Sequence, residues 1–399
     1  MRRVLFVLDT LESGGAQRSL VNFLKELDSY ESNIEVDLLL FARRGVFLNQ
    51  LPQAVCILNT PREISCMVEP FGSRKFISNI CLRGFTGKIA RLLGKKAFEI
   101  IDPMLNDTQR FWLVWRNYLP DLPGYYDVAV AGLEGVCSYY VMEKTHATRK
   151  VLWFHNNYCD CGYSAEFDHD YYAKADLTAT ISLACLQSLR STFPDLSNRF
   201  VVLGNISNAK TIVEQSNCVV EDSYTTGSLN LLTIGRFEKQ KGYDLLVDAA
   251  SRLRDMGLNY VWRCIGDGSL MEDISCRIAD ESLADRVLLI GLRSNPYPYI
   301  KACDLFVQTS RYEGKSIVLD EAKLLCKPIV ATNYATVRDS IEDGKTGIVC
   351  EMSGAGIAEA IMKLSLSNSQ MNTLSRNLSK DFTRCGSSLE EYLSVYFGD

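Results

Sequence analysis

The chain has 399 residues, more than one compact core usually holds, so two domains of about 150–200 residues each are expected. An apolar content of 47% excludes a disordered chain and a fibrous repeat. The net charge of −5 argues against a general nucleic-acid binder.

Cysteine usage and hydropathy point to a compartment. The 14 cysteines show no paired CxxC spacing, and the lone CxC of Cys159 and Cys161 is a poor zinc signature. The apolar stretch at residues 4–8 soon reaches Asp9 and Glu12 and is too short for a signal peptide. No run of 18 apolar residues predicts a transmembrane helix. We therefore expect a protein with free thiols in a reducing cytoplasm.

The first half of the chain alternates strands and helices. The continuous apolar run at residues 4–8 is typical of a parallel strand that is covered on both faces. Gly14 and Gly15 follow it, and residues 16–27 then carry apolar side chains at helical spacing. Further strands are predicted at residues 36–41, 128–131, 151–154, 177–181 and 200–203.

Residues 62–118 interrupt this rhythm with a basic segment that is rich in aromatic side chains. Between Arg62 and Arg116 there are ten Lys and Arg residues against five Asp and Glu residues. One interpretation is one or two helices that pack on the first domain. The other is an amphipathic surface that contacts a membrane, at the inner membrane face, or a lipid-linked acceptor.

A polar stretch at residues 206–228 without periodicity is interpreted as a linker. Strand–helix alternation then restarts, with strands predicted at residues 229–234, 260–265, 287–290, 305–308, 329–331 and 347–349. Repeated units of this kind predict a parallel sheet with right-handed crossovers. The expected fold class is α/β, with two Rossmann-like domains facing across a cleft. Their predicted bounds are 1–205 and 229–380, and residues 381–399 are expected to form a helix that returns to the first domain.

The strongest chemical signal is the segment GRFEKQKG. A buried strand ends at Ile234, so Arg236 and Lys241 lie on the connection from that strand to the next helix. Ligands of open α/β sheets bind outside the carboxyl ends of the strands. Two cations beside a helix N-terminus suit a pyrophosphate. The alternative is a pair of surface charges that flank a turn.

The second signal is the pair Glu313 and Glu321 in EGKSIVLDE. If a helix begins near Gly314, these carboxylates lie about 12 Å apart along it, which matches the reach from a sugar past a pyrophosphate to a ribose. The amides of Gly314, Lys315 and Ser316 would then point toward the phosphates. The alternative is an ordinary amphipathic helix on which Glu321 is solvated.

Together these segments resemble the GT-B-fold retaining glycosyltransferases of family four, of the bacterial polysaccharide and lipopolysaccharide type. That family joins an Arg–Lys pair after one strand to a later E-x7-E segment. The resemblance extends to GDGS from Gly266, to residues 291–314, to EDGKTGIVC at 342–350 and to SGGAQRSLVNFLKEL at 13–27. It covers nearly the whole chain.

The resemblance implies a role for each matching residue. Arg236 and Lys241 would neutralise the diphosphate of a nucleotide-sugar donor, Glu313 would bind the donor sugar, and Glu321 would bind the ribose. The family's commonest donors are UDP-sugars. Its members are metal-independent, so neither a metal nor another cofactor is expected here.

The first domain contributes a smaller set of candidates. The family resemblance implies that Gly14 and Gly15 let the first loop approach the phosphates and the sugar, because neither carries a bulky side chain. His155 ends the apolar run VLWFH, where the family often has a histidine near the donor sugar and the acceptor. The alternative for His155 is an ordinary loop or core histidine. Asp168-His169-Asp170 is interpreted as a solvated helix start, not as a metal site.

The expected function is metal-independent transfer of a sugar, with retention, to a hydroxyl of a glycan or lipid-linked glycan acceptor in surface polysaccharide biosynthesis. In this mechanism the leaving diphosphate helps to remove the acceptor's proton, and Arg236 and Lys241 stabilise its charge. Two alternatives remain: a GT-B nucleotide-sugar epimerase and a non-catalytic GT-B partner subunit. A nicotinamide-dependent dehydrogenase is disfavoured because no GxGxxG follows the first strand.

Overall fold

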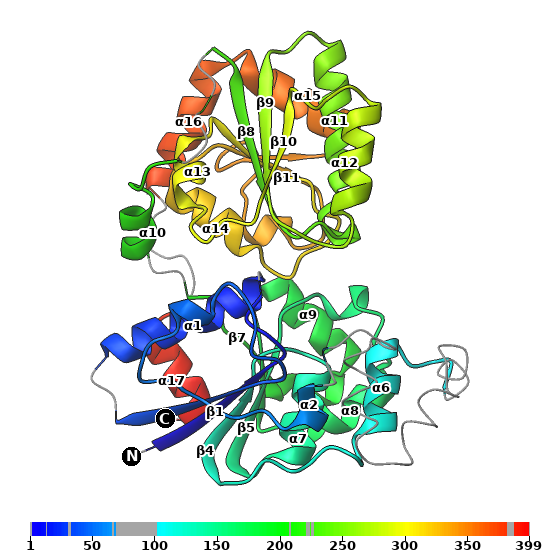
Figure 1. The fold of residues 1–399 in the computed structure, drawn as a ribbon, viewed down its shortest axis with the longest axis vertical. Coiled ribbons are helices and arrows are strands. Elements are labelled where there is room, and N and C mark those ends of the chain that lie inside the picture. Colours follow the sequence, from blue (N-terminus) through cyan, green and yellow to red (C-terminus); the bar gives the residue numbers. More distant parts are fainter. Residues whose placement is uncertain are drawn as a thin grey trace. The chain divides into compact units, whose positions relative to one another are not determined.

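The computed structural model divides into two compact units (Figure 1). The N-terminal unit comprises Met1–Gly204 together with Ser387–Asp399, and the C-terminal unit comprises Asn205–Gly386. The structure describes residues 2–12, 14–30, 33–65, 68, 102–206, 209–220, 224, 227–380 and 387–398.

The described part of the N-terminal unit is built on a seven-stranded parallel sheet with the order β3-β2-β1-β4-β5-β6-β7. Its strands are β1 Arg2–Leu8, β2 Ile34–Leu40, β3 Cys56–Ile57, β4 Tyr126–Ala131, β5 Ala147–Phe154, β6 Leu177–Thr180 and β7 Phe200–Val202. Its helices are α1 Gly15–Ser29, α2 Arg62–Ser65, α6 Asp107–Trp115, α7 Val136–Lys144, α8 Ala165–Lys174, α9 Leu183–Thr192 and α17 Leu389–Phe397, with shorter 3₁₀ turns η1 Leu48–Gln50, η3 Tyr158–Asp160 and η4 Pro194–Arg199. All strands except β3 were predicted from their apolar runs. Strand β3 has two residues and leaves no such run.

The C-terminal unit is built on a six-stranded parallel sheet with the order β10-β9-β8-β11-β12-β13 among the described residues. Its strands are β8 Leu229–Ile234, β9 Tyr260–Ile265, β10 Val287–Gly291, β11 Leu305–Gln308, β12 Ile329–Thr332 and β13 Ile348–Cys350. Its helices are α10 Ala209–Gln215, α11 Tyr243–Asp255, α12 Met271–Asp280, α13 Tyr297–Ala302, α14 Ile317–Leu324, α15 Gly354–Ser365 and α16 Asn368–Lys380, with 3₁₀ turns η5 Lys239–Lys241 and η6 Val337–Asp339. The α/β class with two Rossmann-like sheets is confirmed.

Both sheets are buried on their two faces, as parallel sheets require. The last five residues of β1 are at most 2% exposed, and every residue of β9 is buried. Helix α1 covers its sheet with one apolar face that includes Leu20, Phe23 and Leu27. Because both faces are covered, the polar ends of the strands and the loops that follow them are the places where a ligand can be bound.

Helix α17 packs against α1 and β5 of the N-terminal unit, although it lies at the far end of the sequence (Figure 1). Tyr392 stacks on Phe23 with ring centroids 5.1 Å apart, and Tyr396 meets Phe6 edge-on at 5.8 Å. The hydroxyl of Tyr392 also donates to the carbonyl of Gly204 at 2.9 Å. The helix therefore supplies part of the aromatic core of the N-terminal unit.

The segment expected to be a linker contains helix α10. Its Ile212 is 2% exposed and belongs to an apolar cluster of the C-terminal unit that includes Tyr297 and Leu319. The helix has seven residues, so it is too short to show an apolar repeat in the sequence.

The basic segment at 62–118 is described only in part. Helix α6 packs as the first interpretation expects, because Trp112 is fully buried and donates to the hydroxyl of Tyr171 at 2.9 Å. Residues 69–101, with the basic cluster of the second interpretation, lie outside the described residues. No described helix has the length and apolar character needed to span a membrane.

Replacing Tyr396 with alanine should destabilise the N-terminal unit by about 3–5 kcal/mol, because it removes a buried ring from the contact between α17 and the sheet. Tyr125→Ala is the matched control, since Tyr125 is 63% exposed in the same unit and should cost less than about 1 kcal/mol. Urea unfolding of both variants measures the difference. Equal unfolding midpoints would show that α17 is dispensable to this core.

Candidate active site

The candidate site of the C-terminal unit lies where β8 and β11 end. These strands are neighbours, whereas β9 and β10 lie on the other side of β8, so the order of strands reverses between β8 and β11. Leu305 pairs with Leu231 and Phe306 with Leu232, which brings the carboxyl ends of both strands to one edge of the sheet. Such a switch point is where open α/β sheets bind their ligands.

The loop after β8 presents Arg236 to solvent. Phe237, the next residue, is buried and stacks on Tyr243 with ring centroids 3.9 Å apart. Arg236 is exposed and makes no ion pair within the part of the chain that the structure describes. The buried Phe237 therefore anchors the loop and leaves the guanidinium group available.

Gly266 lies under this loop. A Cβ atom at Gly266 would come within 1.9 Å of the carbonyl oxygen of Gly235, and one at Gly268 within 2.6 Å of the backbone nitrogen of Phe237. The two glycines of GDGS thus allow the loop after β9 to pack directly beneath the loop that carries Arg236. A glycine is needed at position 266 because the two loops approach each other so closely there.

Lys241 and Glu313 are in direct contact. The Lys241 Nζ atom lies 2.5 Å from Glu313 Oε1, and the side chains are 18% and 8% exposed. Lys241 ends the 3₁₀ turn η5, and Gly242 beyond it adopts a left-handed conformation with φ of 64°. A side chain there would strike the carbonyl oxygen of Thr309, which lies 2.1 Å from the position of a Cβ atom. The glycine therefore lets the turn that carries Lys241 approach the segment after β11.

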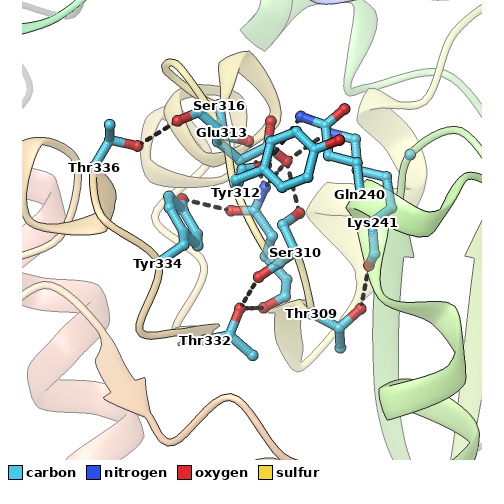
Figure 2. Close-up of polar contacts among 12 residues, drawn as sticks. Gln240, Lys241, Thr309, Ser310, Tyr312, Glu313, Ser316, Thr332, Tyr334 and Thr336 are labelled. Carbon is cyan, nitrogen blue, oxygen red and sulfur yellow. Dashed lines mark hydrogen bonds and ion pairs between the residues drawn. The ribbon is translucent and has the colours of Figure 1, made fainter. Parts of the chain in front are cut away.

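Three donors converge on one oxygen of Glu313 (Figure 2). Besides Lys241, the hydroxyl of Ser310 donates to Oε1 at 2.6 Å and the amide of Gln308 donates to it at 3.1 Å. The Gln308 amide also donates to the Ser316 hydroxyl at 2.8 Å and accepts from Tyr334 at 3.1 Å. Glu313 Oε2 makes no hydrogen bond with the described residues. The carboxylate is thus held on one side only.

Helix α14 begins at Ile317, three residues later than expected, with Ser316 as its N-cap residue. The residues before it are held in other ways: the Glu313 carbonyl accepts from the Thr336 hydroxyl at 2.8 Å, and Ser316 is extended, with ψ of 106°. Gly314, Lys315 and Ser316 therefore form an irregular approach to the helix, not its first turn. The expected 12 Å helical spacing between the glutamates does not apply.

Lys315 and Glu321 are tied to other parts of the same segment. The Lys315 Nζ atom lies 3.5 Å from an oxygen of the buried Asp320. Glu321 is 1% exposed and accepts a hydrogen bond from the Tyr297 hydroxyl at 3.2 Å. The interpretation of Glu321 as a solvated surface residue is therefore wrong. Helix α14 packs against α10 and α13, so Glu321 is covered by protein.

The N-terminal unit also carries a set of polar residues at the carboxyl ends of its strands. Helix α1 begins at Gly15, with Gly14 as an extended N-cap residue. Just before this loop, Asp9 accepts hydrogen bonds from the Thr10 amide at 2.5 Å and from the Gln17 side chain at 3.3 Å. Burial raises the pKa of Asp9 above its ordinary value.

His155 follows β5 and is held by the loop after β4. Its backbone amide donates to Glu134 at 3.0 Å, and its ring stacks on Trp153 with centroids 4.9 Å apart. The Nε2 atom lies 3.1 Å from the Gly132 carbonyl, which can only accept, so Nε2 carries the proton. Desolvation lowers the pKa of His155. The neutral ring then has an unprotonated Nδ1, which makes no hydrogen bond to any described residue.

Glu134 was not predicted from the sequence. One of its oxygens accepts from the His155 amide, and the other accepts from the side chain of Asn156. The signal that could have found it is GLEG directly after the apolar strand β4. A carboxylate after a buried strand is placed as Arg236 is after β8.

Asp168 is buried, which corrects its interpretation as part of a solvated helix start. It is 2% exposed and accepts hydrogen bonds from Tyr139 at 2.6 Å, from Gln109 at 2.8 Å and from Tyr158 at 2.9 Å. Tyr158 lies three residues after His155, so this network fixes the loop behind the histidine. Among the described residues, no three His, Cys, Asp or Glu side chains gather in a way that could hold a metal ion.

Residues 223–381 match the family model described as glycosyl transferases group 1. A curated relative is the N-acetylgalactosamine-N,N'-diacetylbacillosaminyl-diphospho-undecaprenol 4-alpha-N-acetylgalactosaminyltransferase of Campylobacter jejuni, 27% identical over 52% of this chain and 56% of that protein. Another is the alpha-D-kanosaminyltransferase of Streptomyces kanamyceticus, 35% identical over 30% of this chain and 31% of that protein. The chain spans at most about 60% of the length of these relatives.

Solved structures share the fold over both units. Anabaena HepE in complex with UDP and glucose has a TM-score of 0.64 and 18% identity, over 96% of this chain and 95% of that one. A variant of Staphylococcus aureus TarM, in complex with fondaparinux, alpha-GlcNAc-glycerol and UDP, has a TM-score of 0.68 and 14% identity, over 100% and 99%. The family match covers the unit that carries Lys241 and Glu313, and the shared fold covers both sheets. The chain therefore has the GT-B fold, and its residues 223–381 match the glycosyl transferases group 1 family.

Proposed function

We propose that this protein transfers a sugar from a nucleotide-diphosphate donor, a UDP-sugar, to a hydroxyl of a glycan or lipid-linked glycan in surface polysaccharide biosynthesis. The family match and the named transferases among the relatives support the reaction class. Relatives named for lipopolysaccharide core biosynthesis and for an undecaprenol-linked sugar support the acceptor class. The UDP and UDP-glucose bound by structural neighbours support the donor.

The contact between Lys241 and Glu313 is the observation that carries this proposal. It joins a cation and a carboxylate from two neighbouring strand ends at a switch point of the sheet. In the proposed complex, Lys241 and Arg236 neutralise the donor diphosphate. The free oxygen of Glu313 accepts a hydrogen bond from a hydroxyl of the donor sugar. A cation that is largely shielded from solvent stabilises the charge of a leaving diphosphate more strongly than one in water.

Residues near the start of α14 complete the proposed donor site. The N-terminus of a helix favours negative charge, so the segment from Gly314 to Ser316 is suited to lie beside the phosphates. Glu321 is assigned to the ribose. Its carboxylate is already oriented by Tyr297, which would reduce the cost of ordering it around a ligand.

The N-terminal unit is proposed to serve the sugar and the acceptor. Gly14 and Gly15 would let the first loop approach the donor closely. The unprotonated Nδ1 of His155 would accept a hydrogen bond from a sugar hydroxyl. We propose retention by a same-face route, in which the bond from the anomeric carbon to the diphosphate breaks, the acceptor oxygen bonds to that carbon, and a diphosphate oxygen takes the acceptor's proton. Orientation and stabilisation of the leaving group supply the catalysis.

Peripheral attachment to the inner membrane face is the corresponding proposal for the location, with the protein otherwise in the cytoplasm. It rests on the excess of Lys and Arg within residues 62–118 and on the lipid-linked substrate that the name of one relative contains. Basic clusters bind anionic lipid surfaces with about 1 kcal/mol per cation.

Replacing Lys241 with alanine should lower donor turnover about 10²–10³-fold, because a cation that stabilises the leaving group is lost. Glu313→Gln should also lower donor turnover, because it removes both the ion pair with Lys241 and the charged oxygen that accepts a hydrogen bond from the donor sugar. Release of UDP from UDP-glucose or UDP-N-acetylglucosamine, in the presence of a glycan acceptor, measures both. Lys239→Ala is the control, since this exposed lysine lies on the same turn. Turnover of Lys241→Ala equal to that of the control would remove the assignment.

Chelation with EDTA should leave turnover within about twofold, because Arg236 and Lys241 supply the charge that a magnesium ion supplies in other transferases. The measurement is UDP release before and after EDTA, and again after addition of excess Mg²⁺. Loss of activity that Mg²⁺ restores would refute metal independence.

Reversing the charges of Lys88, Arg91, Lys95 and Lys96 to glutamate should abolish binding to anionic lipid vesicles at low salt, because four favourable contacts become repulsive. Co-sedimentation with phosphatidylglycerol vesicles measures the effect, and phosphatidylcholine vesicles are the control. Equal co-sedimentation of the wild type and the variant would exclude this segment as a membrane contact.

A further inference from the structure

Gln308, the last residue of β11, is the buried centre of the polar network around Glu313. It is 6% exposed, and its amide makes three side-chain contacts. An ionised carboxylate can only accept hydrogen bonds, so the amide nitrogen of Gln308 must face Glu313. The amide oxygen then faces the hydroxyl of Tyr334, which donates to it. Burial raises the pKa of Tyr334 well above its ordinary value, so this donor keeps its proton.

The network treats the two oxygens of Glu313 differently. Oε1 accepts from Lys241, Ser310 and Gln308, while Oε2 makes no hydrogen bond with the described residues. The terminal torsion of a glutamate has broad minima, so the plane of its carboxylate is set by its partners. Three donors on one oxygen fix that plane and leave the other oxygen for a ligand.

Among the three donors, Gln308 is the rigid one. The Ser310 hydroxyl can rotate about the Cβ–Oγ bond. Lys241 has a long, flexible side chain that would also bind a diphosphate. The Gln308 amide is planar and is held at both ends, by Tyr334 on its oxygen and by Ser316 on its nitrogen. In Figure 2, Tyr334 lies at the left of the view, below Ser316 and Glu313.

We propose that Gln308, oriented by Tyr334, is a positioning residue that sets the plane of the Glu313 carboxylate and so determines how strongly the donor sugar is bound. This inference rests on the proposed function. It divides the affinity for the donor into two contributions. The contribution of the nucleotide is independent of Gln308, and the contribution of the sugar depends on Gln308.

The test compares UDP with UDP-glucose and UDP-N-acetylglucosamine by calorimetry. Gln308→Met keeps the length of the side chain and removes all three contacts, and it should weaken binding of the accepted UDP-sugar about 10–100-fold. Binding of UDP itself should stay within about twofold. Tyr334→Phe keeps the buried ring and should weaken the UDP-sugar about 3–10-fold, because the Gln308 amide loses its fixed orientation.

Tyr224→Phe is the matched control. The Tyr224 hydroxyl also makes one hydrogen bond in the same unit, to the Tyr299 carbonyl at 2.7 Å, but it has no link to Glu313. It should change the thermal stability about as much as Tyr334→Phe does, and it should leave both affinities unchanged. This control separates a loss of stability from a loss of positioning.

Several outcomes would overturn the inference. Gln308→Met could weaken UDP and the UDP-sugar equally or leave both unchanged, Tyr224→Phe could reproduce the effect, or neither sugar could alter the wild-type affinity relative to UDP. If the wild type binds no UDP at all, the proposed function itself fails. A wild type that binds the UDP-sugar more tightly than UDP, with Gln308→Met unchanged, removes only the role of Gln308.

Discussion

The contact between Lys241 and Glu313 is the constraint on which the rest of the site depends. A carboxylate that is almost fully shielded from water must have partners, because an isolated buried charge is costly. Glu313 obtains them from three directions: a cation after β8 and two neutral donors from its own strand and loop. The glycine after Lys241 and the glycines under Arg236 permit the close approach of the loops that this arrangement requires.

Much of the fold follows from a single pattern, the buried apolar strand. Runs such as residues 4–8 and 229–234 are apolar throughout because helices cover both faces of each sheet. The pattern fails where an element is too short to show it, as in β3 and α10. The pattern also leads to a wrong prediction that Asp168 is exposed to solvent. A run of polar residues in the sequence does not show that this carboxylate faces inward beside Tyr139 and Tyr158.

The site divides in the same way. The position of Arg236, Lys241 and Glu313 at the carboxyl edge of the sheet could be predicted, since the loops that follow buried parallel strands lie at that edge. Gln308 as a partner of Glu313 and Glu134 as a partner of His155 could not be predicted. In the sequence, Gln308 is only a polar residue at the end of a strand, and Glu134 is only an acidic residue in a loop. The start of α14 was placed too early, since no local rule shows that Thr336 holds the backbone of Glu313 outside the helix. Contacts between residues distant in sequence decide these details.

The packing of α17 on α1 and β5 has a consequence for the biosynthesis of the protein. Residues 389–397 are translated after the C-terminal unit, yet Tyr392 and Tyr396 pack in an aromatic core with Phe6 and Phe23, which are translated before that unit. Domains usually fold in the order of their synthesis. Here the N-terminal unit must wait with part of its apolar surface uncovered until translation has passed the C-terminal unit, so the later half of the chain folds as an insertion within the earlier one.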